Sequence, residues 1–564
     1  MKKFTVHLLA SSVIYLIIAF GPGNELYAGD PDTDAASIVR QLVEDYDNEE
    51  TPGGVIWVMR DNKVVYQNAF GMANLSYNVP FDLTTPTNIG STSKQFTAFA
   101  IALLEDQGQL SVEDDIREYI PELPQLGDTV RLRHLISHTS GYREYLNSLA
   151  MSGLHLSDHI RRKEIIALIR NQPKLQNTPG DIYNYNNTGY ALLAMVVEKV
   201  TGEDFPDWMQ ENVFKPLGME QTLIRRHPGH IVPGRAQGYS VEEEEIAAVS
   251  DIYASMGPGG IYTTPVDLEK WIRNFYDPVV GSPEIIEKMT TPFLLNNGKT
   301  TSYGYGLVIG ELNGLKMIQH GGADVAHRSV FVLFPEVEGA VVTQSNNNTF
   351  PDQIAKRVAE AFFSDLMDIE ESDHSQADAS FVYDPEKFDK LSGRYEMEAA
   401  PGFIMEFTRE EDQLYAQATG QPRFEIFSGS DSTFYLTVVE ASMTFHRNED
   451  GEADAVTLHQ NGNHRLNRIT EPAWEPSADD LDNYTGRYFS EELEAFYRVE
   501  VNDEGKLILW QRRLGEIPLK ADDKDAFAGA FPIMNLNFIR NAEGGVTAFE
   551  ASSGRSTGII FEKQ

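Results

Sequence analysis

A serine and a lysine three residues apart are the first candidates for chemistry in this sequence. Ser91 and Lys94 stand at the start of an apolar stretch that predicts a helix over residues 94–107. Side chains at this spacing share one face of a helix, so the amine can take the hydroxyl proton if burial or neighbouring cations lower the lysine pKa. The helix N-terminus adds a positive pole beside a developing oxyanion. The pair predicts nucleophilic catalysis, although an N-cap serine with a surface lysine explains the pair when it is taken alone.

Further motifs along the chain favour catalysis over the explanation as a helix cap. They are His138-Thr139-Ser140-Gly141, Tyr183-Asn184-Tyr185-Asn186-Asn187-Thr188-Gly189-Tyr190, Gly257-Pro258-Gly259-Gly260-Ile261-Tyr262-Thr263-Thr264 and His320-Gly321-Gly322. Together with Ser91 and Lys94 they resemble the serine β-lactamase and penicillin-binding-protein superfamily, in the branch of class C β-lactamases, D-aminopeptidases and family VIII-type esterases. The resemblance spans roughly residues 35–365, with the motifs in the family's chain order.

The resemblance implies a role for individual residues. Ser91 matches the acylated nucleophile, and Lys94 matches its proton acceptor. Tyr185 shares the proton transfer, and Asn187 contacts the substrate amide. The backbone amides of Ser91 and Ala323 are the expected oxyanion hole. No metal and no cofactor are implied.

Two departures from the family pattern leave questions open. His320 stands where the family has the lysine of Lys-Thr-Gly, and Gly322 of the same motif is an expected substrate contact. The imidazole could supply positive charge, or it could be a neutral hydrogen-bond partner of Tyr185, and we favour the neutral role. The tyrosine motif is ambiguous because Tyr183 lies two residues before Tyr185, and the following Thr188-Gly189-Tyr190 favours Tyr185.

The order of the elements predicts an α+β fold for this region. Strands near residues 55–69 and 304–344 bracket a helical middle, so one antiparallel sheet built from the two ends and covered by helices fits the order. The expected helices cover residues 94–107, 189–200, 206–213 and 266–275, and a further one begins near Ile354. The resemblance identifies this fold as the β-lactamase/transpeptidase type.

The C-terminal part of the chain contains a repeat with an offset of 93 residues. Both copies consist of short alternating strands with Gly, Asn and Asp turns and no helical periodicity, which predicts two small antiparallel β-barrels, lipocalin-like by resemblance to the three-domain D-aminopeptidases. The expected divisions are a signal peptide at residues 1–28, the hydrolase domain at 29–368, a linker at 369–380 and barrels at 381–471 and 472–564. In that arrangement a barrel loop can reach over the active site. The matches are Ser392-Gly393-Arg394-Tyr395 with Thr485-Gly486-Arg487-Tyr488, Leu414 with Leu507, and Phe445-x-Arg447-Asn448 with Phe538-x-Arg540-Asn541.

The composition and the N-terminal sequence limit the possible partners and the cellular compartment. The 46 basic and 85 acidic residues give a net charge of −39, which excludes a nucleic-acid partner. The absence of cysteine excludes disulfides, thiolate metal sites and a Cys nucleophile. Lys2 and Lys3 precede an apolar stretch, and Ala28 offers a cleavage site, so we expect an exported periplasmic or secreted protein without stable membrane insertion; an uncleaved anchor is the alternative. The oligomeric state is left open.

Two other motifs are discounted. Gly554-Arg555-Ser556-Thr557-Gly558 fits the G-x-S-x-G pattern of α/β-hydrolases, but no histidine follows it, so we interpret it as a β-turn. His155 and His159 have helical spacing without the glutamate of a zinc motif.

The sequence therefore predicts an exported serine hydrolase that acts through an acyl-enzyme on amides or peptides with D-residues. An esterase or a true β-lactamase of the same fold is the alternative within the enzyme class. An inactive relative that binds a ligand or a cell-wall component is the alternative of another class. The substrate is a small molecule or a peptide.

Overall fold

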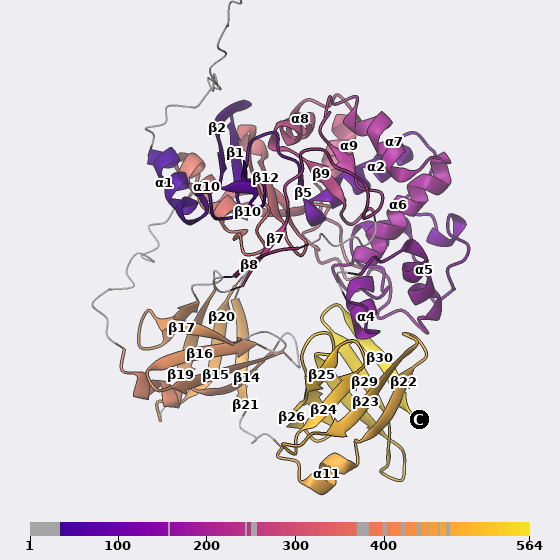
Figure 1. The fold of residues 1–564 in the computed structure, drawn as a ribbon, viewed down its shortest axis with the longest axis vertical. Helices are drawn as coiled ribbons and strands as arrows, with labels where there is room; N and C mark the ends of the chain where they lie inside the picture. Colours follow the sequence, from indigo (N-terminus) through magenta and orange to yellow (C-terminus); the bar gives the residue numbers. More distant parts are fainter. Residues whose placement is uncertain are drawn as a thin grey trace, which may run out of the picture.

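The computed structural model describes residues 34–155, 158–242, 245–249, 256–368, 383–398, 403–418, 423–436, 441–448, 450–460, 463–469 and 474–564. The expected signal peptide and the expected linker at 369–380 lie outside these residues, and the domain boundaries stay predictions. Figure 1 shows an α+β N-terminal domain above two β-barrels, which we call barrel 1 and barrel 2 in chain order. Within the described ranges no helix is both long and apolar enough to cross a membrane.

The central sheet of the N-terminal domain is built from the two ends of this region, as predicted. Its antiparallel order is β10-β11-β12-β13-β1-β2. Asp61 and Asn62 both have positive φ in the turn between β1 and β2, which suits a tight hairpin. The strands are β1 (Gly54–Arg60), β2 (Lys63–Phe70), β10 (Val308–Leu312), β11 (Leu315–Ala323), β12 (Arg328–Phe334) and β13 (Gly339–Ser345).

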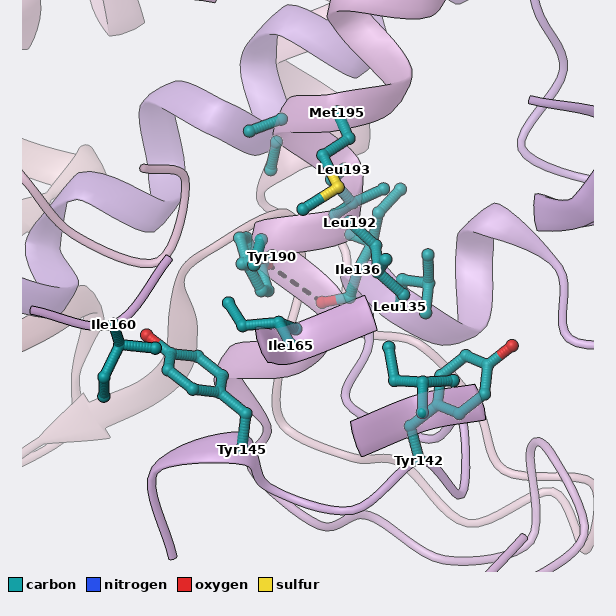
Figure 2. Close-up of a cluster of buried hydrophobic side chains, with 14 of the residues drawn as sticks. Leu135, Ile136, Tyr142, Tyr145, Ile160, Ile165, Tyr190, Leu192, Leu193 and Met195 are labelled. Carbon is teal, nitrogen blue, oxygen red and sulfur yellow. Dashed lines mark hydrogen bonds between the residues drawn. The ribbon is translucent and has the colours of Figure 1, made fainter. Parts of the chain in front are cut away.

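The two faces of the sheet bury different cores because side chains alternate along each strand. Ile56 and Val58 pack with α1 (Asp34–Leu42) and α10 (Ile354–Phe363), whereas Trp57 and Met59 face the larger helical layer. In that layer Tyr190 donates from its hydroxyl to the Ile136 carbonyl at 2.9 Å, inside the apolar cluster of Figure 2. The helical layer contains α2 (Lys94–Asp106), α3 (Leu132–Ile136), α4 (Tyr145–Met151), α5 (Arg162–Asn171), α6 (Asn187–Thr201), α7 (Phe205–Met209), α8 (Pro265–Tyr276) and α9 (Pro283–Met289).

Two elements differ from the predicted bounds. The helix expected over residues 206–213 is α7 followed by a π-turn at Gln210–Phe214. The strand expected over 304–312 is shortened to β10, because Gly306 has a φ of +74° and lies against the backbone of α2, where a Cβ would meet the Lys94 carbonyl carbon at 2.5 Å. Short strands complete the domain: β3 (Met72–Asn74), β4 (Val79–Pro80), β5 (Thr87–Asn88), β6 (Leu223–Ile224), β7 (Tyr239–Glu242), β8 (Glu245–Ala248) and β9 (Ile261–Thr263).

Barrel 1 is a closed antiparallel barrel of strands β14 to β21, which pair in chain order. A short 3₁₀ helix (Pro385–Lys390) precedes it, although the sequence shows no helical period there, because six residues are too few to establish one. The strands are Gly393–Met397, Ile404–Glu410, Gln413–Ala418, Arg423–Ser428, Thr433–Leu436, Ser442–Arg447, Ala453–His459 and Asn463–Ile469.

Barrel 2 repeats this plan as a nine-stranded sheet in the order β25-β24-β23-β22-β30-β29-β28-β27-β26. Its last two strands follow those of barrel 1 at the offset of 93 seen in the sequence. Helix α11 (Ala478–Asp482) precedes it, capped by Ser477. The strands β22 to β30 are Gly486–Ser490, Ala495–Val501, Leu507–Gln511, Gly515–Pro518, Lys520–Asp523, Ala526–Ala528, Asn535–Arg540, Val546–Ser553 and Ser556–Lys563.

Candidate active site

Ser91 lies in a 3₁₀ turn, Gly90–Ser93, that leads directly into α2. This turn packs backbone to backbone against the end of β11. A Cβ on Gly322 would meet the Ile89 carbonyl oxygen at 2.0 Å, and one on Gly90 would meet the Ala323 amide nitrogen at 2.7 Å. Glycine at both positions therefore brings the nucleophile turn and the strand together, which puts the backbone of Ala323 beside Ser91.

Lys94 is fully buried and hydrogen-bonded on every side. Its Nζ lies 2.9 Å from Ser91 Oγ, 2.8 Å from Asn187 Oδ1 and 3.0 Å from the Pro258 carbonyl oxygen. Burial holds the pKa of Lys94 well below its usual range; the charge of Glu144 opposes this, and that of Arg555 adds to it. In the free base two N–H bonds serve Asn187 and Pro258, so the lone pair faces the Ser91 hydroxyl and can accept its proton.

A buried carboxylate orients the lysine through Asn187. Glu144 caps the start of α4 and is fully buried. Its Oε2 accepts from the Asn187 backbone amide at 2.5 Å, and its Oε1 accepts from Asn187 Nδ2 at 3.1 Å. This fixes the amide of Asn187 with its oxygen toward Lys94. The expected contact of Asn187 with a substrate amide stays a prediction, and Asn187 lines the pocket in front of Ser91.

Tyr185 lies beside Ser91 and Lys94. Its ring centre lies 4.8 Å from Lys94 Nζ, and its interaction with Ser91 opposes the effect of burial on its pKa. Burial raises the pKa of Tyr185 above its usual range, so the hydroxyl is protonated at neutral pH and can pass on a proton. The rings of Tyr183 and Tyr185 both pack against His138, with centroids 5.8 and 4.3 Å apart, so the contact with Lys94 is what distinguishes Tyr185. The geometry supports Tyr185 as the motif tyrosine.

His320 is buried and neutral, but the partner suggested by the sequence is corrected. Its Nδ1 lies 2.6 Å from the Gly321 carbonyl, which can only accept, so Nδ1 carries the proton. Its Nε2 therefore accepts from the Tyr303 hydroxyl at 3.0 Å. The ring centres of Tyr303 and Tyr185 lie at similar distances from the imidazole, 5.8 and 6.0 Å, so the hydrogen bond is what identifies Tyr303 as the partner. Burial, with a smaller contribution from Lys94, lowers the pKa of His320 to about 3. Tyr303, and not Tyr185, is therefore the hydrogen-bond partner of the imidazole.

The remaining expected site residues stay predictions, with positions that suit them. Ala323 and Ser91 line one pocket together with Asn187, Pro258 and the Gly259-Gly260 pair, so the two amides expected to hold an oxyanion belong to the same small space. Gly322 is buried behind the nucleophile turn, where its lack of a side chain is needed for packing.

The turn between β29 and β30 of barrel 2 reaches this site. Gln176 and Asn184 donate to the Arg555 carbonyl at 3.2 and 3.0 Å, and Ser556 Oγ donates to the Glu144 carbonyl at 2.9 Å. The Arg555 guanidinium carbon lies 5.2 Å from the centre of the Tyr185 ring.

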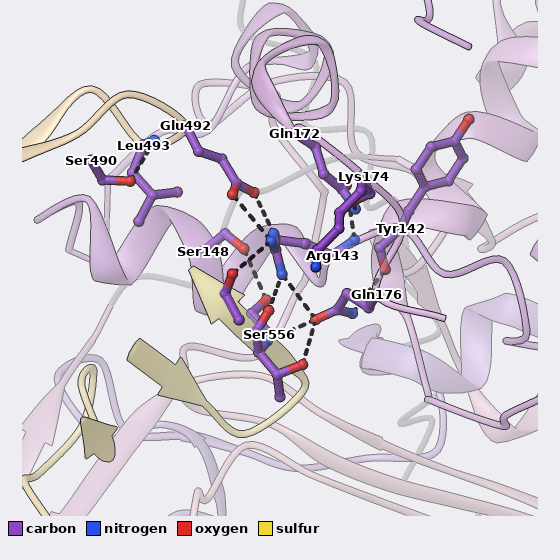
Figure 3. A network of polar contacts seen from close by, with 12 residues as sticks. Tyr142, Arg143, Ser148, Gln172, Lys174, Gln176, Ser490, Glu492, Leu493 and Ser556 are labelled. Atoms are coloured by element: carbon purple, nitrogen blue, oxygen red, sulfur yellow. Dashed lines mark hydrogen bonds and ion pairs between the residues drawn. The ribbon is translucent and has the colours of Figure 1, made fainter. Parts of the chain in front are cut away.

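A buried ion pair holds the base of this turn, as Figure 3 shows. Arg143 and Glu492 form it with side chains 2% and 6% exposed, and Arg143 also donates to the carbonyls of Thr557 and Gly558. The hydroxyls of Ser148 and Ser556 lie 2.8 Å apart beneath it. The pentapeptide from Gly554 to Gly558 is therefore the turn that the sequence predicts, and it packs against Glu144 and Tyr185 beside the site.

Sequence reasoning missed three residues of this arrangement: Glu144, Tyr303 and Arg555. Tyr303 stands in the run Tyr303-Gly304-Tyr305-Gly306, whose alternating glycines could have indicated close packing against another element. Glu144 follows the histidine motif by a few residues, and Arg555 lies more than 400 residues from Ser91. For these two the sequence carries no local signal, because only the tertiary fold brings them to Ser91.

Known proteins share this architecture. The Bacillus subtilis penicillin-binding protein 4* is 25% identical over 441 residues, covering 75% of this chain and 96% of that protein. A Cereibacter sphaeroides D-aminopeptidase is 27% identical over 480 residues, covering 83% and 85%. The structure of an octameric penicillin-binding protein homologue from Pyrococcus abyssi aligns with a TM-score of 0.55 at 25% identity, over 77% of this chain and all of that one.

Two family models match the chain. One, described as a domain of unknown function, DUF3471, matches residues 383–471, which include barrel 1. The other, described as Beta-lactamase, matches residues 36–362, more than half of the chain. The protein is therefore a serine hydrolase that belongs to the β-lactamase family.

Proposed function

We propose that this hydrolase is exported and cleaves amide bonds next to D-residues in short peptides, such as fragments of a cell wall, through an acyl-enzyme on Ser91. The observation that carries the proposal is the buried Lys94, which has Ser91 Oγ as its third polar neighbour. The names of the relatives, D-aminopeptidases and penicillin-binding proteins, support a D-configured substrate.

In the first step Ser91 Oγ attacks the scissile carbonyl carbon, and its proton moves to the free amine of Lys94. The carbonyl oxygen becomes an oxyanion, for which the amides of Ser91 and Ala323 are the proposed donors. The C–N bond then breaks, and the leaving amine takes a proton from the Tyr185 hydroxyl, which recovers one from Lys94. The raised pKa of Tyr185 suits this relay, because a neutral phenol has a proton to give.

In the second step water attacks the acyl-Ser91 ester. Lys94, again a free base, takes a proton from that water with Tyr185, and Ser91 leaves with its hydroxyl restored. Asn187 and Glu144 do not exchange protons in this sequence. They hold Lys94 between Ser91 and Pro258.

The test is labelling with a fluorophosphonate and with a tagged penicillin, followed by peptide mass spectrometry. We expect the adduct on Ser91, no adduct and no turnover in Ser91→Ala, and normal labelling in Ser93→Ala, which changes a buried serine two residues away. A panel of D-residue peptides, D-amino-acid amides, acyl esters and a chromogenic cephalosporin then ranks the substrates. An adduct on Ser93 or Ser556, or turnover retained by Ser91→Ala, would refute the assignment.

A further inference from the structure

Arg555 places its guanidinium over the ring of Tyr185, across the boundary between barrel 2 and the N-terminal domain. Its side chain is half-buried, and its guanidinium carbon lies 5.2 Å from the centre of the Tyr185 ring. Within the described part of the chain, no carboxylate lies within 4.0 Å of this guanidinium. Arg143 and Arg513, at the same interface, pair with Glu492 and Asp158.

The backbone around Arg555 is fixed independently of its side chain. Its carbonyl accepts from Gln176 and Asn184, and the next residue, Ser556, is fully buried and hydrogen-bonded to the N-terminal domain. The amide of Thr557 donates to Gln176 Oε1 at 2.7 Å. These contacts would persist with any side chain at position 555, so they give no structural reason for a cation there.

The charges around Arg555 call for an anion that the described side chains do not supply. The Tyr185 ring that Arg555 contacts also contacts another potential cation, Lys94, and His320 is neutral. Glu144 is occupied by Asn187, and the other buried acid at the site, Asp324, accepts from Asn88 and from the backbone amides of residues 326 and 327. A guanidinium has a planar fork of donors that matches a carboxylate in two parallel hydrogen bonds, and a partly desolvated one gains most from such a partner.

We infer that Arg555 binds a carboxylate of the substrate, so that barrel 2 selects acidic substrates for the serine of the N-terminal domain. The inference rests on the proposed function and narrows its substrate class to peptides with a free carboxylate near the scissile bond. Lys94 Nζ and Arg555 Cζ lie 4.8 and 5.2 Å from the same ring centre and so are at most 10.0 Å apart. That span places the carboxylate within about two residues of the bond attacked by Ser91. A substrate with an α-ammonium at this position would meet like charge.

The test compares an acyl-D-alanyl-D-alanine that has a free carboxylate with the same peptide as a C-terminal carboxamide. Wild type, Arg555→Gln, Arg555→Lys and Arg513→Gln are measured, each on the alkaline plateau of its own pH profile, so that a change in the Lys94 pKa does not contribute. For Arg555→Gln we expect kcat/KM on the acid to fall about 10- to 100-fold, mainly through KM, and on the amide to change less than about twofold. Arg555→Lys should retain part of the preference, and Arg513→Gln should retain all of it.

Binding separates the inference from the proposed function. N-acetyl-D-alanine and its amide are titrated calorimetrically into Ser91→Ala and into Ser91→Ala/Arg555→Gln, with circular dichroism and Tm as checks of folding. Preferential binding of the acid that disappears in the double variant supports the role of Arg555 even if neither peptide is hydrolysed, in which case the proposed function fails alone. Equal affinity for acid and amide in Ser91→Ala, or an equal loss on both peptides in Arg555→Gln, would overturn the role of Arg555.

Discussion

The two barrels have similar sequences but different relations to the catalytic domain. Barrel 1 has a core of its own, centred on residues such as Phe407 and Phe445. The core of barrel 2, with Tyr497 and Phe538, is continuous with the helical core around α2 and α6. In Figure 1 strands β29 and β30 of barrel 2 lie directly below α4, the helix that Glu144 caps.

The corresponding turns of the two barrels show where the difference arises. In barrel 2 the turn from β29 to β30 is clamped to the N-terminal domain by Arg143, Gln176 and Ser148. In barrel 1 the corresponding hairpin, β20 to β21, places His459 and Asn463 at a pocket that they share with Asp352 and other residues of the N-terminal domain. His459 and Asn463 hydrogen-bond each other, with Nδ1 and Oδ1 2.6 Å apart.

The two copies of the repeat therefore share a scaffold of strands, and they differ in the residues of their last hairpin. The strands carry the shared residues, whereas Arg555 and Ser556 correspond to Gly462 and Asn463 in the first copy. Barrel 1 instead contacts barrel 2, through Arg394 with Asp522. The second copy contacts Glu144 and Tyr185 beside Ser91, and the first copy pairs with the second.

The largest expected effect comes from removing one buried ring from the core of each barrel, at two residues related by the repeat. Phe445→Ala and Phe538→Ala remove buried rings and should each cost about 3–5 kcal/mol. For Phe445→Ala we expect a separate low-temperature transition in calorimetry and nearly normal kcat/KM. For Phe538→Ala we expect kcat/KM and the temperature of the main unfolding transition to decrease together. The comparison fails if the two variants behave alike.

A second large effect is expected at the buried ion pair. Glu492→Gln leaves Arg143 charged and without its carboxylate, which should cost about 3 kcal/mol in the free energy of unfolding and loosen the turn that Arg143 holds. The matched variant in barrel 1 is Asp389→Asn, which breaks the exposed pair with Arg409 and should leave the free energy of unfolding nearly unchanged, because water screens that pair. Urea unfolding and kcat measure both. Equal losses of unfolding free energy in the two variants would show that the buried pair contributes no more to stability than the exposed pair.

An intermediate effect is expected at the tyrosine that lies between the two domains. Tyr185→Phe removes the hydroxyl proposed to relay the proton beside Ser91 and Lys94, and should lower kcat about 100-fold or more. Tyr183→Phe keeps the ring packing against His138 and should lower kcat much less. Steady-state kinetics on one substrate decide, and the reverse order would move the catalytic role to Tyr183.

Much of the fold and the nucleophile could be predicted because their signals are local. The Ser91–Lys94 spacing, the hairpin turns and the repeat are each visible within a few residues or at one fixed offset. The single sheet followed from the order of strands and helices. The partner of His320 could not be predicted, because Tyr303 approaches it from a loop packed on α2.

Arg555 illustrates the same limit more strongly. Its pentapeptide was recognisable as a turn, and a turn does not reveal which surface it will meet. The resemblance to three-domain relatives indicated that a barrel loop can reach the site, and the hydrogen bonds of Gln176 and Asn184 identify the loop.

The smallest expected effect is on the pH dependence of kcat/KM. It distinguishes the two barrels by the effect of one positive charge of each barrel on Lys94. The acid limb of kcat/KM should report deprotonation of Lys94, because His320, with a pKa of about 3, does not titrate in the neutral range. Burial is the main cause of the low Lys94 pKa, and the positive charge of Arg555 lowers it further. Arg555→Gln should therefore raise the Lys94 pKa and shift the limb to higher pH, while burial keeps it below that of an exposed lysine.

The matched control is Arg423→Gln in barrel 1, since Arg423 also stacks on a tyrosine, 3.9 Å from the centre of the Tyr415 ring. That cation is on the far side of a separate core, so its loss should leave the limb unchanged. The profile of kcat/KM on the neutral amide substrate avoids any contribution from carboxylate binding. A shift to lower pH in Arg555→Gln, or the same shift in both variants, would show that barrel 2 does not tune the base, because removing a nearby positive charge can only make the protonated amine easier to keep.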